Sequence, residues 1–320
     1  MVELRIQFAF WILFLACFAG ALGQETDLDV GSQSPWAIQK DTGKLILKER
    51  NQPIVIFHYQ DQQCLRPFFS QARTVTGRQV TRNYPPLVGL DPDDHANMHG
   101  GIWLGFGDIN SEDFWRNKAR IVHKQFSKEP AVSAAGIAFE SQDDLIDSKG
   151  NSIGSIQQSY QLTRLELGYC LVWTATLKAG SMPLVLGDQE EMGLGVRVAT
   201  DLTEKNGGVI ASSHGTTGAK ETWGKTADWV DYSKVSDGRR IGVLLVPDAG
   251  NFKPSWFHNR DYGLMVANSF GNKAFTQGAP SAVRIEADQS LKLRYRIYWY
   301  ECGAQDKLPI QRIAKLGDSK

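Results

Sequence analysis

Histidines of the kind that transfer protons or bind metals occur in three short segments of the chain. His95 and His99 lie four residues apart in segment 91–108, after an aspartate-rich stretch and before a run of glycines. That spacing puts both imidazoles on one side of the backbone in a helix and also in an extended strand. The flanking glycines and aspartates argue against a helix, yet the two rings can converge in either conformation. The alternative is that both only hydrogen-bond to loop carbonyls.

A second segment, 188–199, places carboxylates, among them the adjacent pair Glu190 and Glu191, ahead of an expected strand. Alternation along that strand puts Glu191, Gly193, Gly195 and Arg197 on one side. Small residues between polar ends are typical of a pocket floor, and an inward-facing Glu191 is a candidate general base. The competing interpretation is an ion pair between Glu191 and Arg197.

The third segment, 254–264, carries His258, Arg260 and Asp261 just before another expected strand. Such a polar combination is unfavourable in a folded chain unless it is fully hydrogen-bonded or used for function. Arg66 offers a planar donor fork elsewhere, and Trp223 lies near acidic residues as aromatics do in sugar sites, although core packing is the commoner fate of tryptophan.

Charge and missing motifs exclude several classes of function. The formal net charge is zero, with 35 basic and 35 acidic residues and no basic block. Nucleic acid and acidic lipid are therefore unexpected partners. The sequence has no Gly-x-Ser-x-Gly elbow, phosphate loop or dinucleotide fingerprint, which disfavours nucleotide-dependent chemistry.

Period-two alternation is the main secondary-structure signal. It is clearest over 291–299, where Leu, Leu, Tyr, Ile and Trp alternate with Lys, Arg, Arg and Tyr. Further strands are expected at 54–58, 121–126, 136–140, 156–162, 169–177, 195–199, 241–246, 264–267 and 283–286. Many short strands and few helical patterns predict an all-β fold, a large antiparallel β-sandwich.

The N-terminus predicts export. An apolar run over 8–16, followed by small residues, marks residues 1–23 as a signal peptide, and the alternative is a lipoprotein acylated at Cys17. Residues 24–320 show no linker or repeat and are expected to form a single domain. Three cysteines remain, Cys64, Cys170 and Cys302, and we expect buried small side chains, with one bridge plus a free thiol as the alternative.

Taken together, these segments resemble the PmoA-like (methane-oxygenase-A-like) family, a domain of unknown function. The matching stretches are 66–69, 81–86, 94–103, 107–108, 113–115, 191–197, 223–225 and 258–264. Many relatives carry proline where this chain has Gly100 and Ser269. The resemblance implies a secreted or periplasmic β-sandwich often met alongside sugar-oxidoreductase-type proteins, and by analogy a supersandwich similar to the galactose-mutarotase fold. A methane-oxidising role is not expected, because that enzyme has several spanning helices.

These observations predict a carbohydrate-active protein, most simply an enzyme doing acid–base chemistry on a sugar or keto-sugar. The expected catalytic residues are His95, His99, Glu191 and His258. The expected substrate-binding residues are Arg66, Asp94, Arg197, Trp223, Arg260 and Asp261. For these residues to act together, segments 91–108, 188–199 and 254–264 must meet in one concavity.

Three alternatives remain open from the sequence. A divalent metal held by His95, His99 and His258 would polarise a substrate oxygen in the same enzyme class. A non-catalytic glycan-binding module would hold a sugar or glycan without changing it. A purely structural envelope protein would bind nothing. In each case the protein is expected to be secreted or periplasmic, with no membrane span after cleavage.

Overall fold

The computed structural model describes residues 34–287 and 289–318, and the chain from Ser34 onward forms one compact unit. The predicted signal peptide, 1–23, and Cys17 lie outside the described residues. In the described part, no helix is both long enough and apolar enough to span a membrane.

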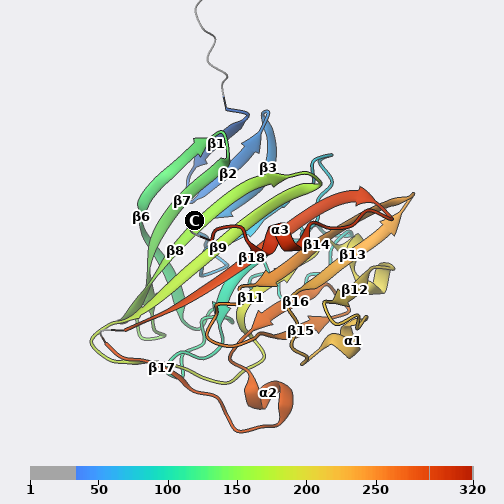
Figure 1. Ribbon diagram of the computed structural model, residues 1–320. Coiled ribbons are helices and arrows are strands. Elements are labelled where there is room, and N and C mark those ends of the chain that lie inside the picture. The colour runs from blue at the N-terminus through green and yellow to red at the C-terminus, as the bar shows by residue number, and fades with distance from the viewer. Residues whose placement is uncertain (1–33, 288, 319–320) are drawn as a thin grey trace, which may run out of the picture. The chain divides into compact units, whose positions relative to one another are not determined.

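Two eight-stranded antiparallel sheets make up the fold, as the sequence predicts (Figure 1). The first has the order β1 (Trp36–Asp41), β2 (Lys44–Glu49), β3 (Gln52–His58), β4 (Phe68–Ser70), β5 (Ile102–Phe106), β11 (Met192–Arg197), β16 (Leu264–Asn268) and β15 (Trp256–Arg260). The second has the order β12 (Val209–Ser212), β13 (Val230–Ser236), β14 (Arg239–Pro247), β18 (Ser290–Gly303), β9 (Gly168–Ala179), β8 (Ser152–Leu165), β7 (Gly136–Ile146) and β6 (Arg120–Ser133).

Smaller elements complete the described chain. Strands β10 (Leu184–Leu186) and β17 (Val283–Ile285) pair with each other. Three short α-helices occur, α1 (Ala219–Thr222), α2 (Asn272–Thr276) and α3 (Ile310–Ala314), with 3-10 turns at Thr200–Leu202 and Glu204–Asn206. Figure 1 shows α1 beside β15, and this neighbourhood forms one wall of the site described below.

Apolar side chains from both sheets form the main core between them. Phe57 of β3 lies 5.0 Å from Phe139 of β7 and 4.9 Å from Tyr160 of β8, measured between ring centroids. Along β7 and β8 buried and less buried residues alternate, as the period-two pattern requires. Every residue of β5, β11 and β16 is buried, which means that loops cover the face of these strands that points away from the core.

That covered outer face has its own apolar cluster. Its buried members are Cys64, Phe68, Trp103, Trp115, Leu264 and Val266. Gly195 makes room for this cluster, because a Cβ at that position would lie 2.6 Å from the indole of Trp103. The predicted small-residue strand face is therefore the floor on which an aromatic ring rests.

All ten predicted strands are present, several of them longer than expected. Two differences affect the site. Residues 256–260 and 102–106, which are not among the predicted strands, form β15 and β5. Both are short strands whose residues are largely buried on both faces, which erases the alternation that marks a strand in sequence. Cys64, Cys170 and Cys302 are buried and unbridged, as the simpler expectation has it.

Candidate functional site

The predicted site segments meet on the outer face of the first sheet. Register places Trp103 opposite Gly195, Gly195 opposite Val266, and Val266 opposite His258. Directly opposed residues in an antiparallel sheet project to the same face. Trp103 and His258 therefore share a face, three strand spacings or roughly 14 Å apart. The His95–His99 turn packs on Trp103, and residues 190 and 191 come immediately before β11.

The turn from His95 to His99 brings the two imidazoles into contact. The His99 amide donates to the His95 carbonyl at 2.9 Å, which closes a single helical turn. The two rings lie 4.7 Å apart at an interplanar angle of 15°, and His99 lies on Trp103 at 4.7 Å and 13°. The predicted convergence thus takes the form of a stack of three near-parallel rings.

The two histidines of this stack have different environments. His99 is 3% exposed, and its Nδ1 has no hydrogen-bond partner among the described residues. Burial, followed by the positive charges of neighbours including His95 and Arg197, holds the pKa of His99 well below its usual value. The His95 side chain is 42% exposed, and its Nδ1 lies 2.9 Å from Asp94 Oδ2. His99 is a neutral packing partner, whereas His95 is accessible.

Asp94 is held by a buried arginine. Arg197, which is 0% exposed, donates from Nη1 to Oδ2 at 2.9 Å and from Nη2 to Oδ1 at 2.8 Å. Burial of Asp94 opposes ionisation, but the hydrogen bonds from Arg197 and His95 prevail and lower the pKa of Asp94 to about 2. Asp94 and Arg197 were both predicted to bind substrate, and in the structure they bind each other.

Arg66 is also committed to the protein's own backbone. It is 3% exposed and donates from Nη1 to the Trp115 carbonyl at 2.8 Å and from Nη2 to the Met98 carbonyl. Arg82 likewise binds the backbone of the His95 turn, donating to the carbonyls of Asp94 at 2.7 Å and His99 at 3.1 Å. The donor fork predicted at Arg66 therefore fixes the loops that cover the sheet.

Glu191 pairs with a residue that the sequence did not single out. Its Oε2 accepts from Arg116 Nη2, and Arg116 Nη1 also lies 3.0 Å from Asp113 Oδ2. The alternative ion pair between Glu191 and Arg197 was wrong, because Arg197 is taken by Asp94. The Glu191 carboxylate thus already has a cationic partner.

His258, Arg260 and Glu190 form a connected group at the end of β15. Arg260 donates from Nε to His258 Nε2 at 3.0 Å and from Nη2 to Glu190 Oε2 at 2.9 Å. Because arginine only donates, His258 carries its proton on Nδ1. That atom lies 3.2 Å from Glu190 Oε2, yet out of line for a hydrogen bond. Burial, followed by the charge of Arg260, lowers the pKa of His258 to about 3.

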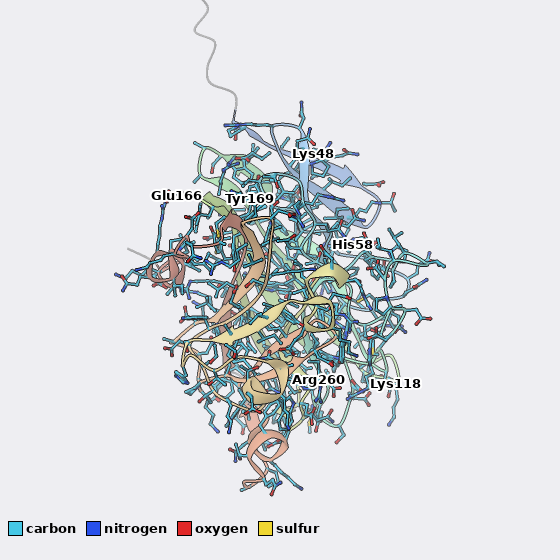
Figure 2. The ribbon with its side chains drawn as sticks, turned by 90° about the vertical axis from the view of Figure 1, so that its right-hand side faces the viewer. Lys48, His58, Lys118, Glu166, Tyr169 and Arg260 are labelled. Atoms are coloured by element: carbon cyan, nitrogen blue, oxygen red, sulfur yellow. The ribbon has the colours of Figure 1, made fainter. Side chains whose placement is uncertain are left out.

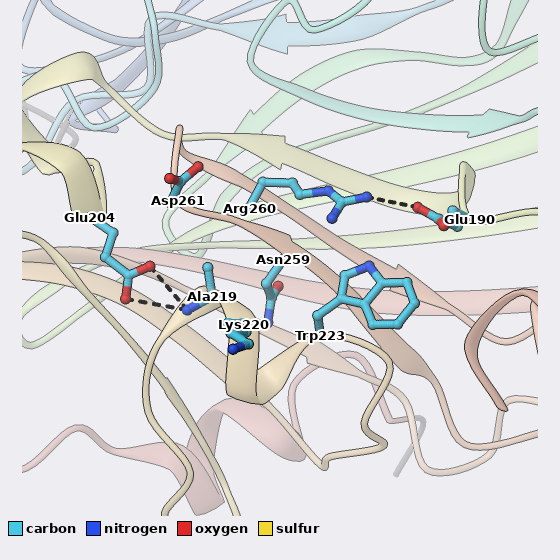
Figure 3. A pocket seen from close by; sticks show the side chains of 8 residues that line it. All are labelled: Glu190, Glu204, Ala219, Lys220, Trp223, Asn259, Arg260 and Asp261. Carbon is cyan, nitrogen blue, oxygen red and sulfur yellow. Dashed lines mark hydrogen bonds and ion pairs between the residues drawn. The ribbon is translucent and has the colours of Figure 1, made fainter.

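A cavity of about 580 Å³ opens beside this group. Its lining residues are Glu190, Glu204, Ala219, Lys220, Trp223, Asn259, Arg260 and Asp261. Figure 3 shows the Arg260 side chain reaching toward Glu190 above the indole of Trp223. The guanidinium carbon lies 5.8 Å from that ring's centroid. In Figure 2, Arg260 lies toward the opposite end of the molecule from Tyr169, which lines a different cavity.

Three predicted residues line the cavity: Trp223, Arg260 and Asp261. His258 contacts it through Arg260, whereas His95, His99 and Glu191 lie outside its lining. Sequence reasoning missed the roles of Glu190, Glu204, Lys220 and Asn259. Glu190 and Asn259 adjoin predicted residues and could have been included, but Glu204 and Lys220 lie in ordinary polar surroundings without any motif.

Tyr262 connects the cavity with the His95 turn. It follows Asp261 in sequence, its ring lies 4.5 Å from the Arg197 guanidinium carbon, and it lies 6.1 Å from the His95 ring at 15°. Tyr262 therefore contacts the His95 turn and follows a lining residue of the cavity in sequence.

The side chains do not fit the predicted metal site. Within residues 34–287 and 289–318, no group of three or more His, Cys, Asp or Glu side chains is arranged to hold a metal ion. The stacked rings of His95 and His99 lie face to face, so their nitrogens do not converge, and His258 Nε2 already accepts from Arg260.

A model for a family described as a family of unknown function, DUF6807, matches residues 44–315. No curated protein matches the chain. The PmoA-like label expected from the sequence is not the label of the matched family, and that resemblance remains a prediction.

Several solved structures are similar to this one. The Slr1438 protein from Synechocystis sp. PCC 6803 is 12% identical, with a TM-score of 0.37 and coverage of 84% of this chain and 96% of that one. A galactose mutarotase-like protein from Lactobacillus casei ATCC 334 is 8% identical, with a TM-score of 0.37 and coverage of 83% and 100%. A galactose mutarotase related enzyme from Lactobacillus acidophilus is 7% identical, with a TM-score of 0.35 and coverage of 85% and 100%. Likenesses at this level carry no argument about function.

Proposed function

The chain belongs to the DUF6807 family of unknown function, and from its own site we propose that it is a carbohydrate-active protein that binds a sugar beside Trp223 and Arg260. The observation that carries the proposal is the fixed group of Glu190, Arg260 and Trp223, in which the guanidinium is held 2.9 Å from the carboxylate and over the indole. Sugars combine apolar ring faces with hydroxyl groups, and this wall offers an aromatic surface together with charged hydrogen-bonding groups.

The lining as a whole suits a neutral, polyhydroxylated ligand. Glu190, Glu204 and Asp261 supply acceptors, whereas Lys220 adds a donor to that of Arg260. A hydroxyl group both donates and accepts, so neighbouring sugar hydroxyls can use both kinds of partner at once. A cavity of about 580 Å³ is also within the usual size range of small-molecule sites.

The proposed chemistry is acid–base catalysis on the bound sugar. The second candidate is a glycan-binding module without activity, which the nearly balanced charges of the lining would serve equally well. The enzyme and the glycan-binding module would both bind the sugar, and only the enzyme would convert it.

Saturation-transfer NMR with a panel of mono-, di- and keto-sugars tests the binding. We expect at least one sugar to receive saturation from the protein, and Trp223→Leu to weaken its binding about tenfold, which corresponds to about 1.4 kcal/mol. Trp229→Leu is the matched control, because Trp229 lines a different cavity. Equal weakening by both variants, or no binding of any sugar, would contradict the proposal.

We also propose that the protein is secreted or periplasmic, on the pattern of residues 1–23. Mass spectrometry of the exported protein should give a chain that begins at Gln24. Retention of the full-length chain inside the cell would contradict this.

A further inference from the structure

We infer that the chain has a second ligand site, which binds a small organic anion carrying a carboxylate or phosphate group. The site is the cavity lined by Tyr169, toward the opposite end of the molecule from Arg260 (Figure 2). We call it the arginine cavity, after Arg50, Arg73 and Arg164 in its lining. The inference is independent of the proposed function, because in the described chain the two cavities have no lining residue in common.

The arginine cavity lies where turns from the two sheets meet. Glu49 and Arg50 are at the turn between β2 and β3 of the first sheet, whereas Arg164 and Tyr169 belong to β8 and β9 of the second. Arg73 comes from the segment that follows β4. The volume of the cavity is about 520 Å³, which is within the usual range of small-molecule sites. It therefore has room for an organic molecule and not only for a bare ion.

Positive charge predominates in this lining. Its charged side chains are those of Arg50, Arg73, Arg164 and Glu49, an excess of two positive charges. The chain as a whole has a formal net charge of zero, so this excess is local. A concave surface with charges of one sign raises the local concentration of ions of the opposite sign. The charge of the cavity thus favours an anionic ligand.

One of the three arginines is held in place by buried side chains. Arg164 donates from Nη1 to Glu49 Oε2, and its guanidinium carbon lies 5.7 Å from the centroid of the Tyr169 ring. The Tyr169 hydroxyl donates to the same Glu49 oxygen at 2.8 Å. Glu49 and Tyr169 are buried, whereas the Arg164 side chain is 38% exposed. The ion pair and the ring therefore fix the guanidinium group and leave part of it accessible to a ligand.

The other two arginines have no carboxylate partner in the part of the chain that the structure describes. Arg50 is exposed and Arg73 is half-buried. The side-chain hydrogen bond of Arg73 runs from Nη1 to the Gly77 carbonyl at 3.2 Å, which leaves its other guanidinium nitrogens available. Guanidinium groups match the geometry of carboxylate and phosphate oxygens. Together with Arg164, these two side chains can supply donors to one anionic group.

The rest of the wall indicates what the anionic group is attached to. Pro53 and Val75 contribute apolar surface, and the Gln52 amide both donates and accepts hydrogen bonds. Thr76 donates its hydroxyl hydrogen to Glu301, which lies outside the lining, so this hydroxyl offers the cavity only lone pairs. A carbon skeleton that carries hydroxyl groups suits such a wall. Sugar acids and sugar phosphates both combine this skeleton with one anionic group.

Isothermal titration calorimetry with D-glucuronate and with glucose 6-phosphate tests the inference, and the two probes distinguish a carboxylate from a phosphate. We expect wild-type protein to bind at least one of them. The double variant Arg50→Gln with Arg73→Gln should raise its Kd by about tenfold or more, because two of the three guanidinium groups are lost. Both side chains are at least partly exposed, so this variant should fold, which thermal unfolding verifies.

The matched control is Arg120→Gln with Arg312→Gln. It removes the same charge from two exposed arginines that lie outside the lining of the arginine cavity. We expect this control to change the Kd by less than about twofold, because long-range effects of exposed charges are screened by salt.

Glu49→Gln should act in the opposite direction. It removes the negative charge of the lining, and the amide oxygen that replaces the carboxylate can still accept from Arg164 or Tyr169. We therefore expect the Kd of the anion to fall by about threefold, since repulsion between two negative charges is lost. A rise in Kd for a folded Glu49→Gln variant would contradict the inference. The arginine pair decides the question whether or not this variant folds.

The outcomes separate this inference from the proposed function. Wild-type protein that binds neither anion would overturn the inference, and so would equal weakening by the two double variants. Weakening by Lys220→Gln, and not by the change at Arg50 and Arg73, would also overturn it, because Lys220 lines the cavity beside Trp223. Each of these results would leave sugar binding beside Trp223 untouched, and failure of sugar binding there would leave the arginine cavity untouched.

Discussion

Arg197 donates two parallel hydrogen bonds to Asp94, from Nη1 to Oδ2 at 2.9 Å and from Nη2 to Oδ1 at 2.8 Å. The arginine ends a central strand of the first sheet and is fully buried, whereas the carboxylate belongs to a loop 103 residues earlier in the chain. This one pair fastens the histidine turn to the sheet. The turn and the strand are therefore held together as one unit.

Replacement of Asp94 by Asn should destabilise the fold. Loss of one partner of a buried pair costs about 3–5 kcal/mol, but the Asp94 side chain is 35% exposed, so we expect about 2 kcal/mol. The folded-state pKa of Asp94 is about 2, below its ordinary value of 3.8. Its stabilisation is thus present above about pH 4 and lost as the pH falls toward 2. Urea unfolding from pH 6 to 2 should show this loss in wild type and not in the variant, and parallel curves would contradict it.

Two of the histidines with a lowered pKa, the buried His258 and the half-buried His58, should make the fold less stable as the pH falls below about 6.5. Burial lowers the pKa of His258 to about 3 and that of His58 to about 4, so the unfolded chain takes up these protons first. Each contribution is complete above the usual pKa of 6.5 and declines from there at up to roughly 1.4 kcal/mol per pH unit. NMR of the ring Cε1–H signals should show both imidazoles neutral at pH 5. A midpoint near 6.5 for either would refute this.

Gly195→Ala should disturb the floor of the site. The added Cβ would meet the Trp103 ring at 2.6 Å, and overpacking of this kind costs roughly 1–3 kcal/mol. Gly303→Ala is the control, since its Cβ would meet only the side chain of Asp306. Thermal unfolding of both variants provides the measurement, and equal melting temperatures would show that the contact is unimportant.

Glu191→Gln separates two views of the site. The sequence favours Glu191 as the catalytic base, in which case the variant should be inactive. In the structure its carboxylate pairs with Arg116, both side chains being partly exposed, so we expect turnover of a sugar substrate within about threefold of wild type and a stability change under about 1 kcal/mol. An inactive, folded variant would restore Glu191 to the catalytic role.

Much of the fold follows from alternation alone. The long strands β7 and β8 each have one face in the core, so the alternation in their sequences predicts them. Strands β5 and β15 escaped prediction because loops cover their outer face, and nearly uniform burial leaves no pattern. Alternation is lost where the outer face of the sheet is covered, and the site lies on that face.

The candidate site was only partly predictable for a related reason. Unusual residue density pointed to His95, Asp94, Arg197 and Arg260, and all of them lie on one face. The ion-pair partner of each residue depends on contacts between distant segments. Asp94 pairs with Arg197, and Glu191 pairs with Arg116. Sequence spacing carries no information about such pairings. For the same reason, the sequence does not predict that Glu204 and Lys220 form part of the cavity wall.

The most direct test of sugar binding beside Trp223 is a titration that follows the indole N–H signal of that residue in ¹⁵N–¹H NMR spectra, assigned by its loss in Trp223→Phe. We predict a saturable shift of this signal with at least one mono-, di- or keto-sugar, and little movement of the Trp229 signal. A bound sugar that moves other tryptophan signals and leaves that of Trp223 unchanged would contradict the account.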